Sequence, residues 1–539
     1  MSSNTRILIL NNIKLPLNAS PKEAFSLAKA RLTSIGISAR ELKLSIYKKS
    51  IDARKKSDIK LVYSISAAGE IPNLSDSMLA RISATLLRSE NLFDFDTGTE
   101  ELGAPPLVVG SGPCGLFAAL MLAERGYRPI LIERGGSIAD RRAAVDTFKR
   151  LGILDPDTNI QFGAGGAGTF SDGKLVTRVN DPLTSYILKK FVEFGAPEEI
   201  LYLAKPHVGT DILSEIIDKM LKRLEELGAQ VRYNTKYLSS YKLTDKSVAR
   251  TTAGDIEYGA LILAIGHSAR DTYESLLSSG YAIEPKQISV GMRIEHKAAD
   301  IDRAMFGEQA GHPSLAHAEY NLSTNTKKRG VYTFCMCPGG EVVAAASEEG
   351  GVVVNGMSQH ARSGENSNCA VVCSVFKEDY GASPYRAIAF QREIEKNAYL
   401  AGGADYSAPV ITVGDFLSDS CKREPYYVMP TYRDGNHVKL ASPSEYLPSF
   451  VTKEIKNALL DFNKKIEGFA ADGAVLTGAE TRTSAPIRIL RDESTRVAVG
   501  RNNVYPAGEG AGYAGGITSA AIDGIRTAIA IMKRFKPNG

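Results

Sequence analysis

A glycine-rich turn between an apolar segment and a helix-forming segment constrains this chain more than any other feature of its sequence. Residues 107–115 read Leu-Val-Val-Gly-Ser-Gly-Pro-Cys-Gly. In such a fingerprint, Gly110 permits a tight turn after a strand, Gly112 lets the backbone approach a pyrophosphate, and Gly115 lets the helix pack closely on the sheet. The N–H groups at the start of that helix offer partial positive charge to phosphate oxygens.

An acidic residue follows at the distance that this kind of turn requires. The helix expected over 116–125 leads to a strand over 129–132, and Glu133 stands 18 residues after Gly115. A carboxylate at that place accepts hydrogen bonds from the hydroxyls of an adenosine ribose. The order of strand, glycines, helix, strand and acid therefore predicts a dinucleotide-binding unit, because a glycine-rich turn without a ligand would leave Glu133 unexplained.

Length and composition indicate a globular protein of several domains. A chain of 539 residues exceeds what one hydrophobic core usually holds, and 43% apolar with 23% charged residues is typical of soluble proteins. The first residues carry no signal-peptide pattern, and no apolar run reaches membrane-spanning length. Six cysteines without regular spacing indicate free thiols. We therefore expect a cytoplasmic protein that makes no membrane contact.

Residues 1–100 are predicted to form a separate α+β module. The pattern gives a strand, a helix, two strands and a second helix, which suggests a ferredoxin-like sandwich. The expected strands cover 6–14, 41–48 and 60–66, and the expected helices cover 21–32 and 76–87.

The module also has a net charge of +5, from 15 Lys and Arg against 10 Asp and Glu in residues 1–100, whereas the whole chain has +4, so the remainder is close to neutral. Its basic residues could mark a surface for an acidic partner such as RNA, or they could lie on a solvated strand edge and loop. They are Lys48, Lys49, Arg54, Lys55 and Lys56.

The rest of the chain is predicted to have an α/β fold, with a Rossmann-like domain interrupted by an inserted α+β substrate domain. Residues 101–284 form the first part of the nucleotide domain, 285–465 the insertion, and 466–539 the C-terminal part. An apolar strand over 260–265, ending at Gly266, is typical of a parallel sheet whose carboxyl end lies near the cofactor.

Two further glycine-rich segments are candidates for ligand contact. Five glycines lie between Gly163 and Gly173, in a segment that also holds aromatic residues, so a loop that cradles a ligand is favoured over a flexible linker. Near the C-terminus, a strand enters a turn from Gly508 to Gly516, and the following helix offers a second positive N-terminus.

Together these segments resemble a known family. Residues 105–539 are similar to flavoproteins with a glutathione-reductase type of FAD domain and, more narrowly, to bacterial FAD-dependent dehydrogenases that are often labelled NAD- or FAD-utilising. One departure is Ala164, where the family pattern has an acidic residue. The motifs that carry the resemblance are Val-Val-Gly-Ser-Gly-Pro-Cys-Gly at 108–115, Glu-Arg-Gly at 133–135, the glycine-rich segment 159–175, Lys-Pro-His-Val-Gly-Thr-Asp at 205–211, Leu-Ala-Ile-Gly-His-Ser at 263–268, Phe-Cys-Met-Cys-Pro-Gly-Gly at 334–340 and Tyr-Pro-Ala-Gly-Glu-Gly-Ala-Gly-Tyr-Ala-Gly-Gly at 505–516.

The resemblance implies bound FAD and a role for several residues. Glu133 would hold the adenosine ribose, the backbone around Tyr237 would face the adenine, and Glu509 would accept from ribityl or ribose hydroxyls. The helix that starts near Gly516 would favour the negative charge that develops on the reduced flavin. The residues expected to bind the cofactor are Gly110, Ser111, Gly112, Pro113, Cys114, Gly115, Glu133, Arg134, Arg142, Gly165, Gly166, Gly168, Thr169, Ser171, Asp172, Tyr237, Gly266, Gly508, Glu509, Gly515, Gly516 and Ile517.

Candidates for the chemistry are less sharply defined. Arg293 could clamp an acidic substrate, and His267 and His296 could act as acid or base. Cys335 and Cys337 could form a redox pair or be inert buried thiols, and their spacing with the other cysteines fits no common zinc site, so no metal is expected. A polar cluster expected to contact the substrate contains Asn355, Arg362, Asn366 and Asn368.

The predicted function is that of an FAD-dependent oxidoreductase that moves hydride between flavin N5 and a small organic substrate. Because no second fingerprint is present, either NAD(P)H binds transiently at the flavin or the electrons come from another donor. The alternative is a flavoprotein whose basic N-terminal module binds RNA or protein, including a flavin-dependent RNA-modifying enzyme. The substrate, the direction of reaction and the oligomeric state do not follow from the sequence.

Overall fold

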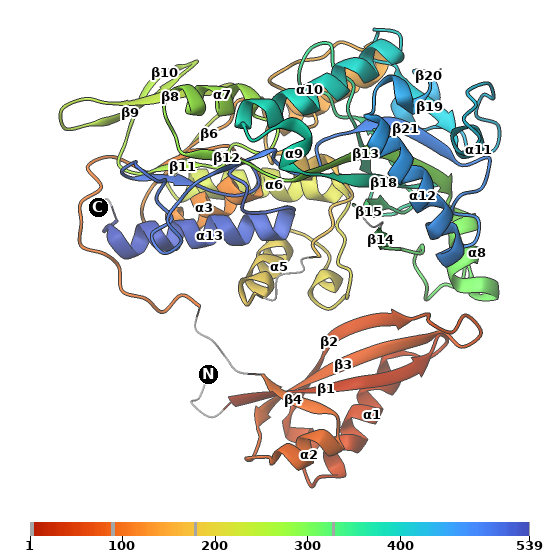
Figure 1. Cartoon of the computed structure of the whole chain (residues 1–539). Coiled ribbons are helices and arrows are strands. Elements are labelled where there is room, and N and C mark those ends of the chain that lie inside the picture. Colours follow the sequence, from red (N-terminus) through yellow and green to blue (C-terminus); the bar gives the residue numbers. More distant parts are fainter. Residues whose placement is uncertain (1–4, 88–91, 177–180, 326–328, 538–539) are drawn as a thin grey trace.

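The computed structural model describes residues 5–87, 92–176, 181–325 and 329–537. The N-terminal module lies on one side of a larger body, which contains the nucleotide domain and the inserted domain (Figure 1). None of the helices in these ranges is long and apolar enough to cross a membrane.

The N-terminal module has the element order β-α-β-β-α-β with an antiparallel sheet ordered β2-β3-β1-β4. This is the order of a ferredoxin-like unit. Its elements are β1 (Thr5–Pro16), α1 (Pro21–Thr33), β2 (Lys43–Asp52), β3 (Lys60–Glu70), α2 (Asp76–Arg81) and β4 (Ala84–Leu87).

The helix predicted over 76–87 is wrong in its second half. Helix α2 ends at Arg81, Ser83 takes a left-handed conformation with φ of 53°, and the next four residues pair with β1 as β4. Pairing with the exposed edge of β1 satisfies the backbone of this segment better than another helical turn would.

The module contacts the body through the basic strand β2. The N–H of Lys49 donates to the carbonyl of Tyr202 at 2.7 Å, and the N–H of Ala204 donates back to Lys49 at 2.9 Å. His312 Nε2 also lies 2.7 Å from Asn18 Oδ1. Part of the basic segment therefore faces the body of the protein, whereas Arg54, Lys55 and Lys56 are exposed.

The nucleotide domain is built on a five-stranded parallel sheet ordered β23-β11-β5-β6-β7. One face packs against helices α3, α6 and α13, and the other packs against a small antiparallel sheet ordered β10-β9-β8. The strands are β5 (Leu107–Val109), β6 (Ile130–Ile132), β7 (Gln230–Arg232), β8 (Tyr237–Lys242), β9 (Ser247–Thr251), β10 (Gly254–Tyr258), β11 (Leu261–Leu263) and β23 (Val504–Pro506). The helices are α3 (Pro113–Ala123), α4 (Ile138–Leu151), α5 (Leu183–Glu193), α6 (Thr210–Glu226), α7 (Arg270–Ser278) and α13 (Ile517–Arg534).

The inserted domain contains a seven-stranded mixed sheet ordered β14-β15-β18-β13-β21-β19-β20. Its strands are β13 (Ile288–Lys297), β14 (Ser323–Asn325), β15 (Gly330–Cys337), β18 (Asn366–Val375), β19 (Ala408–Thr412), β20 (Val438–Leu440) and β21 (Val475–Glu480). The remaining elements of this region are the strands β12 (Ile283–Pro285), β16 (Glu341–Ala344), β17 (Val354–Met357) and β22 (Ile487–Ile489), and the helices α8 (Ala298–Phe306), α9 (Lys377–Tyr380), α10 (Pro384–Ala401), α11 (Val413–Leu417) and α12 (Ser449–Lys465).

The predicted boundary at residue 465 lies too early. Strand β21 comes from the segment 466–539, which was assigned to the nucleotide domain, but it pairs with β13 and β19 of the inserted sheet. The chain returns to the nucleotide sheet only at β23. The sequence did not separate these parts because β21 and β23 are both short, apolar and buried.

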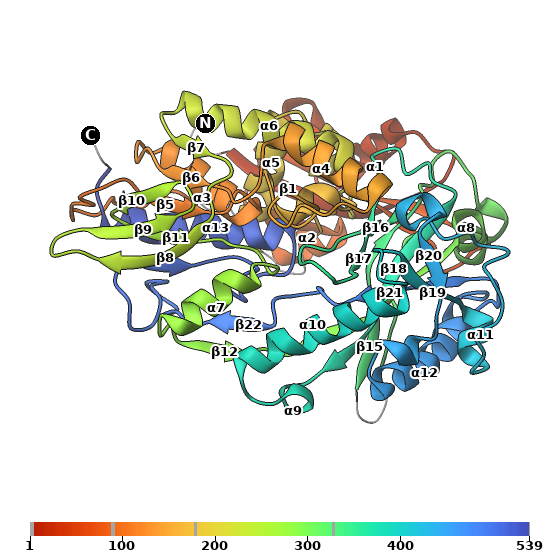
Figure 2. The same ribbon diagram turned by 90° about the horizontal axis from the view of Figure 1, so that it is seen from above.

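A buried ionic network joins the two domains where α10 runs along their junction (Figure 2). Glu395 on α10 accepts from Arg270 of α7 at 2.6 and 2.8 Å and from Arg482 at 2.9 and 3.2 Å. The Thr481 hydroxyl donates to the same carboxylate at 2.6 Å. Because every partner is buried, the network fixes the inserted domain against the nucleotide domain.

Candidate functional site

The fingerprint turn requires glycine at two places for steric reasons. Gly110 has φ of +100°, and a Cβ there would lie 2.4 Å from the carbonyl oxygen of Ala264. A Cβ on Gly115 would lie 1.9 Å from the oxygen of Gly110, so the helix could not approach the strand this closely with any other residue. Gly112 stands at the N-cap of α3, and a Cβ there would lie 3.7 Å from Cα of Gly166 with no other atom within 4 Å.

The Glu133 carboxylate connects the fingerprint turn to the glycine-rich loop. It is 4% exposed and accepts from the N–H of Ser111 at 2.9 Å, the Ser111 hydroxyl at 2.7 Å, the N–H of Gly135 at 3.1 Å and the N–H of Gly163 at 3.0 Å. Protein donors therefore already surround this carboxylate, and its contact with a ribose stays a prediction.

Arg141 supports the glycine-rich loop, and the binding of the cofactor by its neighbour Arg142 stays a prediction. The buried guanidinium of Arg141 donates to the carbonyls of Asn159 and Ala164 at 2.8 Å and of Ile160 at 2.6 Å, while Arg142 is exposed on the other face of α4. The loop is thus packed into the domain and is not a flexible linker.

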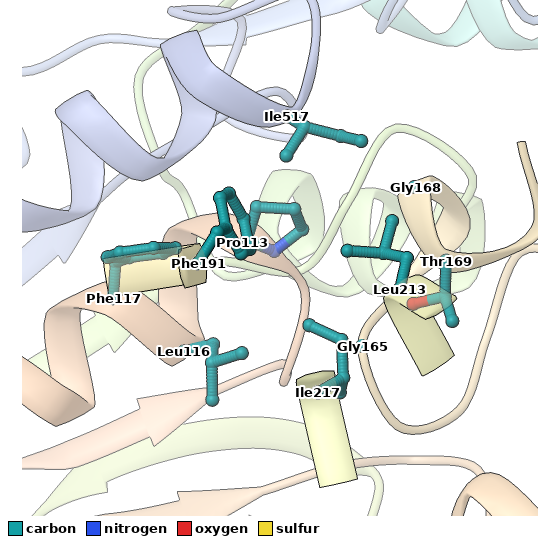
Figure 3. A pocket seen from close by; sticks show the side chains of 10 residues that line it. All are labelled: Pro113, Leu116, Phe117, Gly165, Gly168, Thr169, Phe191, Leu213, Ile217 and Ile517. Carbon is teal, nitrogen blue, oxygen red and sulfur yellow. The ribbon is translucent and has the colours of Figure 1, made fainter. Parts of the chain in front are cut away.

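The glycine-rich loop closes over the fingerprint turn. Gly166 has φ of +66°, and a Cβ there would lie 2.7 Å from Cα of Gly112. Between the loop and the starts of α3 and α13 lies a cavity of about 10 Å³, which is room for about one water molecule (Figure 3). A cavity of this size is a small gap between packed side chains and has no room for a cofactor. The lining residues are Pro113, Leu116, Phe117, Gly165, Gly168, Thr169, Phe191, Leu213, Ile217 and Ile517.

The second glycine turn leaves the start of α13 open. Gly515 and Gly516 are exposed, and a Cβ on either would meet no atom within 4 Å. A Cβ on Gly266, which follows β11, would also meet no atom within 4 Å. Asp523 holds the turn by accepting from the N–H of Gly508 at 2.8 Å, a contact that the sequence did not reveal. These open backbone positions are where a large planar ligand can approach.

Several predicted cofactor residues are already held by the protein. Cys114 is buried, and its side chain packs against Gly508, where an added Cβ would meet it at 2.7 Å. Arg134 pairs with Asp157 and Asp271 at 2.8 and 2.7 Å. The Ser171 hydroxyl donates to Gly168, and Tyr237 is buried beside the small antiparallel sheet. The part of Tyr237 in binding adenine stays a prediction.

Two titratable residues stand near the open backbone positions. Burial raises the pKa of Glu509 to about 7, although the Lys286 cation opposes this effect. Burial, together with the Arg482 and Arg270 cations, lowers the pKa of His267 to about 3. Because of this low pKa, the imidazole is uncharged at neutral pH. Its Nδ1 lies 2.9 Å from the Ser268 hydroxyl, which fixes the orientation of the ring.

An ionic cluster lies at the junction of the two domains. Asp172, predicted to bind the cofactor, instead pairs with Lys174 at 2.9 Å and with Arg362, predicted to bind the substrate, at 2.8 Å. Arg362 also reaches Glu319 at 2.7 Å, and His207 lies 3.5 Å from Asp172. Burial raises the pKa of Asp172, but the His207 hydrogen bond and the two cations outweigh it and hold this pKa well below its usual range.

Sequence reasoning did not select Lys174, His207 and Glu319 as site residues. Lys174 and His207 belong to two of the motifs that carry the family resemblance, and this was the available signal. No sequence motif indicated Glu319, because its partner Arg362 stands 43 residues away in the chain.

Arg293, predicted to clamp an acidic substrate, and His296, predicted as an acid or base, are both buried inside the inserted domain. Arg293 is fully buried and donates to Glu480 at 3.1 Å, to Asn368 at 2.7 Å and to Asn355 at 3.2 Å. Its donors are therefore occupied, and so are the amide oxygens of both asparagines.

His296 and Asn366 also serve the interior of the inserted domain. His296 Nε2 lies 2.8 Å from the carbonyl of Phe469, and burial lowers the pKa of the imidazole to about 4. The Asn366 amide donates to Glu295 at 3.1 Å and to the carbonyl of Met429 at 2.8 Å.

The two glycine turns and the parallel sheet define the class of protein. Each turn opens a helix at the carboxyl end of a strand, where such folds bind nucleotide cofactors, and an added Cβ at Gly266, Gly515 or Gly516 would meet no atom within 4 Å. Comparison with family models agrees: residues 104–255 match an FAD binding domain, and residues 287–483 match the C-terminal domain of FAD-dependent proteins. Residues 8–68 match a domain of unknown function. The protein is thus FAD-dependent.

A full-length relative shows the family. An uncharacterized protein of Clostridium beijerinckii is 43% identical over 534 residues, which is 98% of each chain. The chain belongs to the same family of FAD-dependent proteins as this relative.

Solved structures resemble the chain only distantly. CtdE in complex with FAD has 12% identity and a TM-score of 0.31 over 80% of this chain and 84% of its own. The halogenase PltM has 11% identity and a TM-score of 0.37 over 79% and 68%.

Proposed function

We propose that the protein is an FAD-dependent oxidoreductase that moves hydride between the flavin and a small organic substrate, with NAD(P)H as a transient electron donor. The observation that carries the proposal is the open start of α13. Two exposed glycines leave room there for a planar ring, and the N-terminus of an 18-residue helix favours negative charge on that ring.

The residues around this opening fit FAD. Gly112 and the start of α3 would hold the pyrophosphate, and Glu509 would accept from the ribityl chain or ribose. When bound, the flavin supplies the site for reversible two-electron reduction, and the protein supplies position and electrostatic field.

The ionic cluster of Asp172, Lys174, His207, Glu319 and Arg362 provides the polar wall of the proposed substrate site. It lies where the glycine-rich loop of the nucleotide domain meets the loops of the inserted domain. Because its charges are paired with one another, it favours a polar substrate that exchanges hydrogen bonds over one that brings a large net charge.

The test is an anaerobic reduction of the purified holoprotein. NADH or NADPH is added in separate experiments, and the flavin absorbance is followed, with dithionite as the positive control. We expect bleaching by one of the two nucleotides. Bleaching by dithionite alone would contradict NAD(P)H as donor, and a colourless protein that takes up no FAD would contradict the whole proposal.

A further inference from the structure

Two cysteines of β15 lie in an irregular part of the inserted sheet that the proposed function does not use. Phe334 stands opposite Ala370 and Cys337 opposite Asn368, so β15 holds one extra residue between these pairs. Cys335 occupies this bulge with φ of 44°, an unusual conformation for a residue other than glycine. As a result Cys335 is partly exposed, while Cys337 is completely buried.

The surroundings of the two sulfurs differ in their effect on ionisation. Nη1 of Arg293, on β13, lies 3.0 Å from the carbonyl of Cys335 and 3.9 Å from Sγ of Cys337. The Cys337 thiol donates a hydrogen bond to the carbonyl oxygen of Cys335 at 3.3 Å. The neighbouring Cys337 side chain, with the Arg293 and Lys174 cations, lowers the pKa of Cys335 to about 7, against the effects of burial and of Asp172. The Cys335 side chain and burial raise the pKa of Cys337 well above its ordinary value.

The other cysteines do not share this environment. Cys114, Cys369 and Cys373 are buried, and burial raises the pKa of each. Cys421 is partly exposed, but burial and the nearby carboxylates raise its pKa. Among the six cysteines, Cys335 thus combines exposure with thiolate character, which together determine reactivity.

We propose that Cys335 and Cys337 form a thiol–disulfide exchange site for low-molecular-weight disulfides, in which Cys335 attacks and Cys337 resolves. The Cys335 thiolate bonds to one sulfur of the substrate and expels the other half as a thiolate. The Cys337 thiol then attacks the Cys335 sulfur and passes its proton to the second half of the substrate, which leaves as a thiol. One substrate disulfide becomes two thiols, and the protein pair is oxidised to a disulfide.

The geometry favours a small substrate and a reversible reaction. Cys335 is only partly exposed, so a small disulfide is expected to reach its sulfur more readily than a disulfide held in a folded protein. A disulfide between residues two apart is strained, and strained disulfides are readily reduced. An added thiol such as dithiothreitol is therefore expected to restore both cysteines.

The experiment uses full-length holoprotein carrying Cys421→Ser, which removes the other partly exposed thiol. The protein is reduced, freed of reductant under anaerobic conditions and mixed with an equimolar aromatic disulfide such as 5,5′-dithiobis(2-nitrobenzoate). We expect release of two thiolates per protein and an intact mass that is lighter by two hydrogens, with no adduct. Oxidised glutathione is expected to give the same product.

Single substitutions separate the two roles. Cys337→Ser is expected to release one thiolate and to keep a stable mixed-disulfide adduct, whereas Cys335→Ser should react at least about tenfold more slowly. If either variant fails to fold, peptide mapping of the unsubstituted protein after brief iodoacetamide treatment at pH 7 provides the test. Cys335 should then be labelled about tenfold faster than Cys421.

The proposal is overturned if the Cys421→Ser protein keeps an adduct, if Cys335→Ser reacts at the unsubstituted rate, or if Cys421 is labelled faster than Cys335. Because the exchange needs no flavin chemistry, these outcomes are independent of the anaerobic flavin reduction.

Discussion

At the scale of single residues, the buried charged side chains around the two glycine-rich segments mainly form hydrogen bonds with backbone groups. Glu133 and Arg141 hold the fingerprint turn and the glycine-rich loop through N–H and carbonyl groups. Periodicity would have separated Arg141 from Arg142, because Ile138, Arg141 and Phe148 share the buried face of α4. The pairing partners could not be predicted in this way, since they depend on how distant loops meet.

Glu133→Gln is expected to lower the free energy of unfolding by about 3 kcal/mol, because an amide group cannot accept from all the N–H and hydroxyl donors that now surround the carboxylate. Urea unfolding at pH 7 and the flavin-to-protein ratio measure the effect. Glu124→Gln is the matched control, since Glu124 makes an exposed pair with Lys190 and should cost at most about 1 kcal/mol. Equal losses in the two variants would contradict this role of Glu133.

At the scale of elements, the sequence predicted the strands and helices of the nucleotide domain well because their apolar runs are bounded by glycines. It failed for β4 and β21, two short strands whose assignment depends on pairing with distant strands. The two glycine-containing helix starts also differ in kind: Gly115 is needed for packing, whereas Gly516 is not.

Gly516→Ala is therefore expected to fold with unchanged stability and to bind FAD about tenfold more weakly, because its Cβ projects into the space proposed for the flavin. Thermal unfolding of the flavin-free protein and titration with FAD measure the two properties. Gly115→Ala is the contrast, since the added Cβ meets the Gly110 oxygen and should lower the melting temperature directly. Unchanged FAD affinity in Gly516→Ala would place the flavin elsewhere.

At the scale of the whole molecule, two groups of buried ion pairs hold one domain against the other. The ionic cluster pairs Asp172 with Arg362, and the network below α10 pairs Arg270 with Glu395, across 190 and 125 residues of chain. A single sequence shows the residue types but not these pairings. The structure therefore divides the predicted substrate cluster: Arg362 joins Asp172, whereas the three asparagines bind Arg293 or Glu295 inside the inserted domain.

Glu395→Gln is expected to cost about 3 kcal/mol of unfolding free energy at pH 7, because Arg270 and Arg482 lose a buried anion. These cations hold the pKa of Glu395 well below its ordinary value of 4.5, despite burial, so its stabilisation is complete above pH 4.5 and is lost as the pH falls below it. Urea unfolding from pH 7 to pH 4 should show the difference from the unsubstituted protein shrinking at the acid end. Glu393→Gln, exposed on the same helix, is the control and should show no such difference.

The interruption of the parallel sheet also affects how the protein is made. Strand β23 and helix α13 join β11 and α3, yet β23 begins 241 residues after β11 ends (504 − 263). At roughly 5–20 residues per second, a ribosome needs roughly 10–50 s to cover that interval. During this time the edge of β11 and the apolar face of α3 have no partner, and they need protection from aggregation. Because α13 is made after the whole insertion, its N-terminus cannot take part in holding the cofactor before that interval has passed.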